Sequence, residues 1–224
     1  ASFEREPITR NGSIEANLGR LTNLRDYYPY AVKGGVVKTD EAMQGIMLKG
    51  VDGRYNWDFF RTSLIEGELP AVGDSVQNKD ILISQALSRK MKLAVGDRVE
   101  MLFINADKPP RRDRFKVSGI YKTGLEENDL VTVLTDLRNV QRLNGWDSSL
   151  ITGYEVNATG FDFVENFADD VYRAVLASDR PDDEGLMVSS IAERYRNLFD
   201  WLAALDVNGV VILTIMILVS LLNM

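Results

Sequence analysis

The chain has 224 residues with 26 basic and 33 acidic side chains, a formal net charge of −7, and neither histidine nor cysteine. Without those two residue types it can form no Ser-His-Asp or Cys-His nucleophile, no zinc finger, no haem histidine ligand and no disulfide. The acidic balance also argues against nucleic-acid binding, because contacts with phosphate require clustered lysine and arginine.

The N-terminal quarter predicts one helix followed by a β-hairpin. Residues 13–26 carry apolar side chains at helical spacing, and Pro29 is expected to end that helix. Residues 31–39 and 43–51 are rich in β-branched and aliphatic side chains, which predicts two strands joined by a polar turn.

An aromatic cluster follows in residues 54–61, which are predicted to form a short helix. Its members are Tyr55, Trp57, Phe59 and Phe60. Aromatic rings in such a group act either as packing anchors or as a stacking platform for a ligand, and the sequence leaves both roles open.

The middle of the chain alternates short strands with short helices. A helix is predicted over 85–90, and strands are predicted over 80–84, 98–104, 114–121 and 130–135. Asp136 is suited to cap a second helix that ends near Leu143, and Gly145 is its stop signal.

The segment 105–113 between two of these strands is polar and locally basic, and it contains paired prolines. A stiff, basic protrusion can dock a partner at low ordering cost, whereas the alternative is an ordinary solvated hairpin end. The residues expected to form this docking tip are Asn105, Lys108, Pro109, Pro110, Arg111 and Arg112.

The last third predicts a strand over 154–156, an amphipathic helix over 162–176 and a short strand over 186–189. Ser190 and Glu193 have the spacing of a capping box, which starts a further helix. We call this further helix the coupling helix. Its apolar stripe consists of Ile191, Tyr195, Leu198, Leu202 and Leu205.

The run 207–224 carries no charge. As a helix it would be ~27 Å long, close to the ~30 Å hydrocarbon core of a bilayer. We expect the start of a transmembrane helix, cut inside the span; a buried C-terminal core helix is the alternative. If the coupling helix continues into the span, displacement can pass through the membrane, whereas a hinge at Asn208-Gly209 would separate the two.

No segment has the residue pattern of a catalytic, cofactor or metal site. Neither G-x-x-x-x-G-K-[ST] nor G-x-G-x-x-G occurs in the chain. The acidic clusters 126–129 and 182–184 lack EF-hand spacing and predict solvated turns. The mixture of short strands and helices, without a βαβα rhythm, predicts an α+β fold.

Several segments, taken in order, resemble the MacB-like periplasmic core domain of ABC-transporter permeases. They are GIMLKGVD (Gly45–Asp52), EGELP (Glu66–Pro70), DILISQALSRKMKLAVGDRV (Asp80–Val99) and FKVSGIY (Phe115–Tyr121). Within that superfamily, RFKVSGIYKTGLEEND (Arg114–Asp129) and DLRNVQRLNGW (Asp136–Trp146) are most similar to the lipoprotein-releasing permeases, which are Lol-type and FtsX-like. The similarity covers nearly the whole chain.

The resemblance implies a domain on the periplasmic side of the inner membrane, without catalytic residues or a cofactor. Residues 1–54 plus 150–206 would form a membrane-proximal α+β subdomain, residues 55–149 an inserted β-rich distal subdomain, and 207–224 the start of a transmembrane helix. An ABC ATPase subunit would hydrolyse ATP in the cytoplasm. A second permease subunit would complete the transporter, and the membrane helices would relay the motion.

The family also implies a function and partners. In lipoprotein-releasing permeases a hairpin of this domain hooks the periplasmic lipoprotein carrier, and by position that hook falls on 105–113. The expected function is release or export of lipoproteins or lipids. A MacB-type exporter of peptides or macrolides and a cell-division regulator stay open within the same class.

Two hypotheses from other classes also stay open. One is a membrane-anchored sensor that binds a small ligand near Tyr55–Phe60, and the other is a surface hydrolase that uses a carboxylate pair.

Overall fold

The computed structural model describes residues 6–39, 41–73, 77–105, 108–124, 126–160, 164–178 and 186–194, together with Met216 and Val219. In chain order the elements are β1 (Ile8–Thr9), α1 (Gly12–Leu18), β2 (Leu24–Lys38), β3 (Met43–Val51), α2 (Asp58–Ser63), β4 (Leu64–Gly67), β5 (Asp80–Ser84), α3 (Gln85–Met91), β6 (Arg98–Asn105), β7 (Lys108–Tyr121), α4 (Glu126–Asp129), β8 (Thr132–Asp136), α5 (Leu137–Asn144), β9 (Leu150–Ile151), β10 (Gly153–Ala158), α6 (Val164–Leu176) and α7 (Ile191–Arg194). The fold is strand-rich and mixes both kinds of element, which agrees with the α+β expectation at that level.

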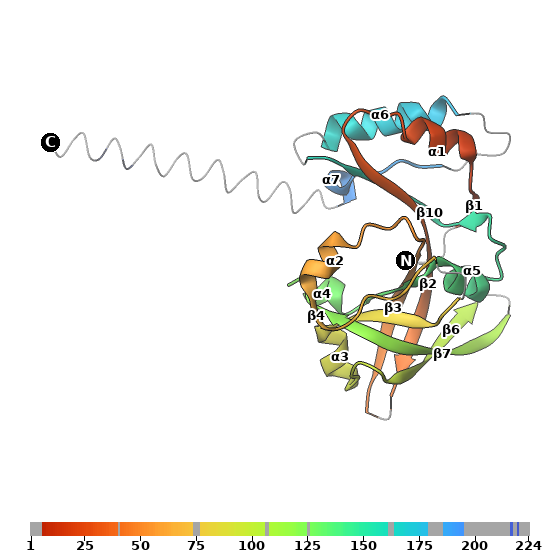
Figure 1. Cartoon of the computed structure of the whole chain (residues 1–224), viewed down its shortest axis with the longest axis vertical. Helices are drawn as coiled ribbons and strands as arrows, with labels where there is room; N and C mark the ends of the chain where they lie inside the picture. The colour runs from red at the N-terminus through yellow and green to blue at the C-terminus, as the bar shows by residue number, and fades with distance from the viewer. Residues whose placement is uncertain are drawn as a thin grey trace.

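Six strands close into a barrel in the lower part of Figure 1. β2 pairs antiparallel with β3, β3 runs parallel to β8, and β8 pairs antiparallel with β5. β5 runs parallel to β7, β7 pairs antiparallel with β6, and Val36 and Val37 of β2 pair with β6 to complete the ring. β4 extends the sheet beside β7, and β10 pairs with the first half of β2.

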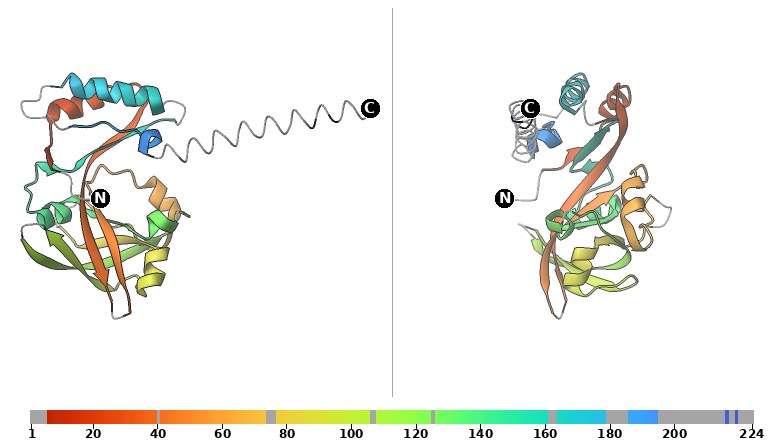
Figure 2. Two further views of the ribbon diagram at one scale, coloured as in Figure 1. Left: turned by 180° about the vertical axis from the view of Figure 1, so that it is seen from behind. Right: turned by 90° about the vertical axis from the view of Figure 1, so that its left-hand side faces the viewer.

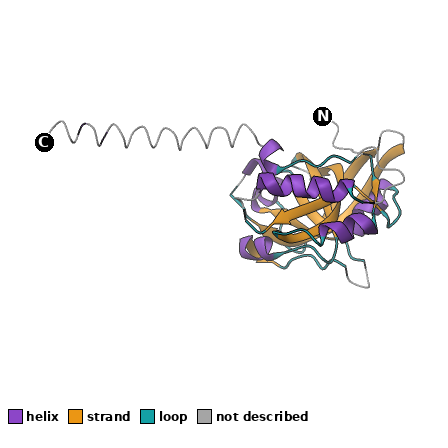
Figure 3. Ribbon diagram, turned by 90° about the horizontal axis from the view of Figure 1, so that it is seen from above, coloured by secondary structure: helices purple, strands orange, loops and turns teal. Residues whose placement is uncertain are grey.

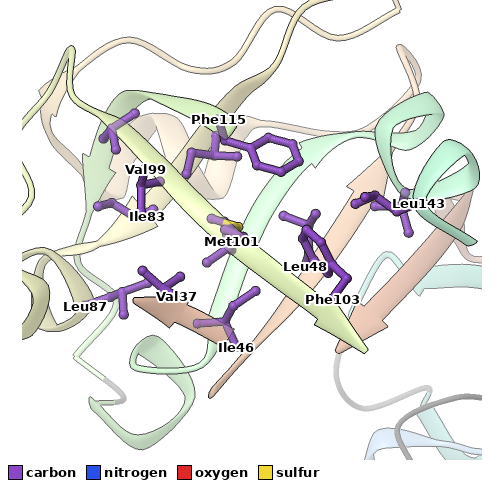
Figure 4. Packing of buried hydrophobic residues seen from close by; sticks show 14 of the residues in the cluster. Val37, Ile46, Leu48, Ile83, Leu87, Val99, Met101, Phe103, Phe115 and Leu143 are labelled. Carbon is purple, nitrogen blue, oxygen red and sulfur yellow. The ribbon is translucent and has the colours of Figure 1, made fainter. Parts of the chain in front are cut away.

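The barrel encloses the main apolar core, which Figure 4 shows from close by. Side chains alternate along each strand, so Met101 and Phe103 of β6 point inward together with Phe115 of β7. A Cβ at Gly35 of β2 would lie only 2.7 Å from the Phe103 ring. The glycine in mid-strand therefore makes room for a large aromatic side chain inside the barrel.

The helices of the barrel begin and end where local signals place them. Asp136 caps α5 as predicted, because its Oδ1 accepts from the backbone N of Arg138 at 2.8 Å. Gly145 ends this helix in the left-handed region with φ of 73°. α5 lies close against β3, since a Cβ at Gly50 would be 2.8 Å from the Cα of Leu137.

A second, smaller layer covers the N-terminal half of β2. Here α1 and α6 lie side by side over β2 and β10, in the upper part of Figure 1 and in both views of Figure 2. Seen from above in Figure 3, helices lie across the strands. The buried residues of this helical layer are Ile14, Leu18, Phe167 and Val171. We call this part the helical layer; the long strand β2 belongs to it and to the barrel.

The predicted helix over 13–26 is wrong beyond Leu18. Asn23 adopts φ of 65°, and from Leu24 onward the chain is strand β2, in which Pro29 pairs with Tyr154. The local spacing of apolar residues favoured a helix, but pairing with β10, more than 100 residues later in the chain, decides for a strand.

Other differences from the predictions are smaller. The strand predicted over 186–189 is wrong, because these residues form no strand in the structure, although Leu186 and Val188 pack against the helical layer. The hairpin of β2 and β3 and the strand β5 are confirmed, and β2 begins earlier than predicted. Strand β4 was not predicted; the short helix α2 begins at Asp58, later than expected.

Only the start of the predicted coupling helix is described. The capping box of α7 is confirmed: the backbone N of Ser190 donates to Glu193 Oε2 at 3.1 Å, and the backbone N of Glu193 donates to Ser190 Oγ at 3.0 Å. Ile191 is half exposed. Tyr195, Leu198, Leu202 and Leu205, and the run 207–224 apart from Met216 and Val219, lie outside the described residues. Within the part that the structure describes, no helix is both long and apolar enough to cross a membrane.

The predicted division into subdomains, 1–54 plus 150–206 against 55–149, stays a prediction. β3, from the first segment, shares the barrel with β5, β6, β7 and β8 from the inserted segment.

Candidate functional site

The predicted docking tip lies on the hairpin of β6 and β7, but it is not the loop that was expected over 105–113. β6 runs to Asn105 and β7 begins at Lys108, and these two residues pair across the hairpin. The register shifts between Phe103 and Asn105, opposite the two prolines. A bulge of this kind lets a strand accept proline, which has no N–H to donate to the ladder, so the strands continue through the predicted loop.

Strand alternation separates the predicted tip residues. Arg112 points to the outer face, where its Nη1 lies 3.5 Å from Glu100 Oε1. Arg111 points the other way, and its Nη1 donates to the backbone carbonyl of Arg142 at 2.9 Å. Pro109 and Pro110 are exposed; the side chains of Asn105 and Lys108 lie outside the described residues. The structure thus does not gather the tip residues into one cluster, and their docking role stays a prediction.

A buried carboxylate fixes the base of this hairpin. Asp113 Oδ1 accepts from Lys79 Nζ at 2.5 Å, and Asp113 Oδ2 forms an ion pair with the guanidinium of Arg142 on α5. Burial acts to raise the pKa of Asp113, but the hydrogen bonds from Lys79 and Arg142 outweigh it and leave the pKa below its usual range. The hairpin is therefore tied to the start of β5 and to α5.

The aromatic cluster near residues 54–61 is mostly packed. Tyr55 lies edge-to-face against Tyr28 and Trp57, with ring centroids 4.5 and 4.7 Å apart. Phe60 packs in the same way against the buried Tyr121, at 5.0 Å. These are the offset geometries that aromatic pairs prefer, so the structure favours packing anchors over a ligand platform.

The side chain of Lys49 lies beside Tyr55 and two tyrosines of β2, where a cationic ligand would otherwise bind. Lys49 Nζ lies 5.9, 5.5 and 5.8 Å from the ring centroids of Tyr28, Tyr30 and Tyr55, and it forms an ion pair with Glu155 of β10. Burial raises the pKa of the Tyr28 and Tyr55 hydroxyls, and the negative charge of Glu155 raises it further.

A polar network joins the helical layer to the loop after β3. Glu15 of α1 accepts from Arg10 Nη2 at 2.9 Å and from Arg54 Nη1 at 3.2 Å, and Arg54 also pairs with Asp52. Tyr154 donates to Glu15 Oε1 at 3.2 Å. Burial acts to raise the pKa of Glu15, but the two arginines outweigh it and leave the pKa below its ordinary value.

A second tie between the two parts uses Asp26 near the start of β2. Its carboxylate accepts from Asn56 Nδ2 at 3.0 Å and from Asn157 Nδ2 at 2.6 Å. One side chain therefore holds both the segment before α2 and strand β10.

The acidic cluster 126–129 is partly structural. Asp129 is buried and accepts from the backbone N of Thr123 at 3.1 Å and from Thr123 Oγ1 at 2.6 Å. The prediction of a solvated turn is therefore wrong for this residue, because its carboxylate closes a turn against β7. The cluster 182–184 lies outside the described residues. Among the residues that the structure describes, no group of three or more acidic side chains is arranged to hold a metal ion.

Sequence reasoning missed the residues that join the two parts of the molecule. Lys49 and Glu155 are 106 positions apart, and Glu15 and Arg54 are 39 apart, so no local pattern connects them. The exposed cations of β6 and β7 outside the tip were also missed, although the alternation of charged and apolar residues over 114–117 carried that signal for β7.

The comparisons with known proteins bear on the fold. A scan of protein-family models finds no match, and neither does a search of curated protein sequences. Among solved structures, the chain is similar to the extracellular domain of the noncanonic ABC-type transporter YknZ from Gram-positive bacteria. The TM-score is 0.51 at 16% identity, over 75% of this chain and 81% of that one.

Two further structures match at lower scores. The periplasmic region of MacB from Actinobacillus actinomycetemcomitans has a TM-score of 0.46 at 14% identity, over 77% of this chain and 86% of that one. A domain of a putative permease protein from Porphyromonas gingivalis has a TM-score of 0.41 at 14% identity, over 78% of this chain and 72% of that one. The similarity to the YknZ extracellular domain shows that the chain has that fold.

Proposed function

We propose that the chain is the extracytoplasmic domain of an ABC-transporter permease subunit, anchored in the cytoplasmic membrane. The observation that carries this proposal is the fold shared with the YknZ extracellular domain. The uncharged run 207–224, which follows the start of α7 after a short interval, supports a membrane anchor.

In this role the domain transmits movement rather than performing chemistry. An ABC ATPase on a separate subunit hydrolyses ATP, a second permease subunit completes the transporter, and α7 leads from this domain toward the membrane. The ties between the helical layer and the barrel, Glu15 with Arg54 and Lys49 with Glu155, suit such transmission, because they join the two parts across long sequence separations.

The cargo that we propose is lipoprotein or lipid. The support is the sequence resemblance of Arg114–Asp129 and Asp136–Trp146 to lipoprotein-releasing permeases. The exposed Pro109, Pro110 and Arg112 of the docking tip are then the proposed contact with a periplasmic lipoprotein carrier.

The absence of cysteine from the chain makes the topology testable by labelling. In the full-length protein, with any cysteine outside these 224 residues replaced by serine, Arg61→Cys places a single thiol at an exposed position of α2. We expect a membrane-impermeant maleimide to label it in intact spheroplasts as fully as in lysed cells. Labelling that requires lysis would overturn the extracytoplasmic placement.

The partner is tested by affinity purification of the full-length protein from its own membranes. We expect an ABC ATPase to co-purify and the complex to hydrolyse ATP, with a Walker-B glutamate variant of that ATPase as the inactive control. Depletion of the protein should leave lipoproteins in the inner membrane. Increased macrolide sensitivity without lipoprotein retention would favour a MacB-type exporter, and recovery of the protein without any ATPase would contradict the permease assignment.

A further inference from the structure

The outer face of the β6–β7 hairpin carries a stripe of cations that extends well beyond the docking tip. Arg112, Arg114 and Lys116 occupy every second position of β7, and Arg98 of β6 lies directly opposite Lys116 in the ladder. All four side chains are exposed, Arg114 by 77%. Alternate strand positions are ~7 Å apart, so this outer stripe is ~14 Å long.

The positive charge of the outer stripe is only partly compensated. On the described outer faces of β5, β6 and β7, Glu100 lies 3.5 Å from both Arg112 and Arg114. Asp80 of β5 lies opposite Lys116 in the ladder, but their side chains form no ion pair within 4.0 Å. Arg98 forms no ion pair with any described residue. Like charges directly opposite each other are unfavourable, and an anionic partner would relieve the Arg98–Lys116 pair.

One end of the outer stripe is apolar. Ile104 is 60% exposed, and Leu102 is half-buried on the same face of β6, opposite Arg112. Pro110 on β7 is also exposed. The face therefore changes along its length from basic at the base of the hairpin to apolar near its end.

The scaffold under this face is held in place. Asp113, which lies between Arg112 and Arg114 and points inward, is bound by Lys79 and Arg142. A surface that is already ordered loses little entropy when a partner binds.

We propose that the outer stripe docks an extended acidic segment of a partner protein, with Asp or Glu at alternate positions and an apolar residue against Ile104. Alternate side chains of an extended segment have the same ~7 Å repeat as the cations of β7. The chain as a whole has a formal net charge of −7, so its other surfaces repel an acidic segment and direct it to the stripe. The inference goes beyond the transporter function and does not depend on it.

Position favours a protein partner over a lipid surface. The stripe lies on the barrel, whereas α7, which precedes the apolar run in the sequence, lies with the helical layer at the other part of the molecule (Figures 1 and 2).

The test measures binding of the full 224-residue chain, in non-ionic detergent, to a fluorescent eight-residue peptide of alternating Glu and Val. We expect Arg114→Glu with Lys116→Glu to weaken binding at least tenfold and to create binding of the matching Lys-Val peptide. The control, Arg20→Glu with Lys122→Glu, changes the charge equally at two exposed cations outside the stripe and should alter affinity less than twofold.

Two results would overturn the proposal. One is equal loss of peptide binding in both double variants, which would mean that only net charge matters. The other is selective loss, in the Arg114/Lys116 variant, of binding to phosphatidylglycerol vesicles while peptide binding stays unchanged, because the stripe would then be a lipid surface. Circular dichroism of both variants checks that the fold is kept.

Discussion

The barrel and the helical layer share strand β2 but are stabilised in different ways. The barrel is a closed ring of strands around one large apolar core, in which Phe103, Leu48 and Val117 are fully buried. The helical layer has a small core, with Phe167 and Val171 still 6 and 7% exposed, and polar ties connect it to the rest. We infer that the barrel is the rigid body of the domain and that the helical layer can separate from it at lower cost.

The largest expected effect compares two phenylalanines, one in each core. Phe103→Ala should lower the free energy of unfolding by about 3–5 kcal/mol, because it leaves a cavity in a closed barrel. Phe167→Ala should cost less, about 2–3 kcal/mol, because the two-helix layer can partly collapse around the space. Urea denaturation of both variants measures the difference, and equal losses would contradict the distinction between the two cores.

The next effect tests how tightly α5 covers β3. Gly50→Ala should destabilise by about 1–3 kcal/mol through overpacking, because the new Cβ would meet Leu137 and Val140 at 2.8 Å. Gly45→Ala on the same strand is the matched control, since nothing lies within 4 Å of its Cβ position. The control should be neutral or slightly stabilising in thermal denaturation. A Gly50→Ala protein as stable as the control would mean that α5 moves freely on the barrel.

A smaller effect isolates the tie between the parts. Arg54→Ala removes the ion pair with Glu15. It should lower the free energy needed to open the helical layer by about 1 kcal/mol, which is a roughly fivefold rise in the opening equilibrium constant. Hydrogen exchange should then quicken at α1 amides and stay unchanged at β5. Arg61→Ala, in an ion pair exposed by 68 and 67%, serves as control and should change neither. Faster exchange in β5 as well would mean that the two parts open together.

The smallest expected effect is a pH dependence with a defined sign. The pKa values of Asp113 and Glu15 are lowered in the folded state, so their charged forms stabilise the fold above the unfolded values of about 3.9 and 4.3. This stabilisation is lost as the pH falls below that range. The urea midpoint should drop between pH 5 and pH 3, and Asp113→Asn should show a shallower drop. An unchanged slope would mean that Asp113 does not contribute.

Local patterns predicted the parts of the fold that depend on nearby residues. The β2–β3 hairpin, strand β5, the Asp136 cap and Gly145 stop of α5, and the Ser190–Glu193 capping box all rest on neighbours within a few positions. The helix predicted beyond Leu18 is wrong because residues far away in the chain decide the structure of this segment. Its apolar spacing was compatible with a helix, but Leu24–Lys38 gains pairing partners in β3, β6 and β10 that no local window contains.

The docking tip shows a different limit, because the residues that decide its structure are close together in the chain. Its basic and proline content was visible in the sequence, but the pairing of Asn105 with Lys108 turned the expected loop into strand and sent Arg111 and Arg112 to opposite faces. The sequence resemblance correctly anticipated a fold shared with an ABC-transporter extracellular domain. The lipoprotein cargo and the carrier contact stay predictions.

By itself, the sequence determined which residue types this chain lacks and where most of its local elements begin and end. A chain without histidine and cysteine excludes whole classes of chemistry, and caps, glycines and alternation act over a few residues. Only the tertiary structure decided how β2 is divided between two cores and which cation lies among the tyrosines. Those outcomes depend on contacts between residues far apart in the chain, whose energies arise only when the barrel closes.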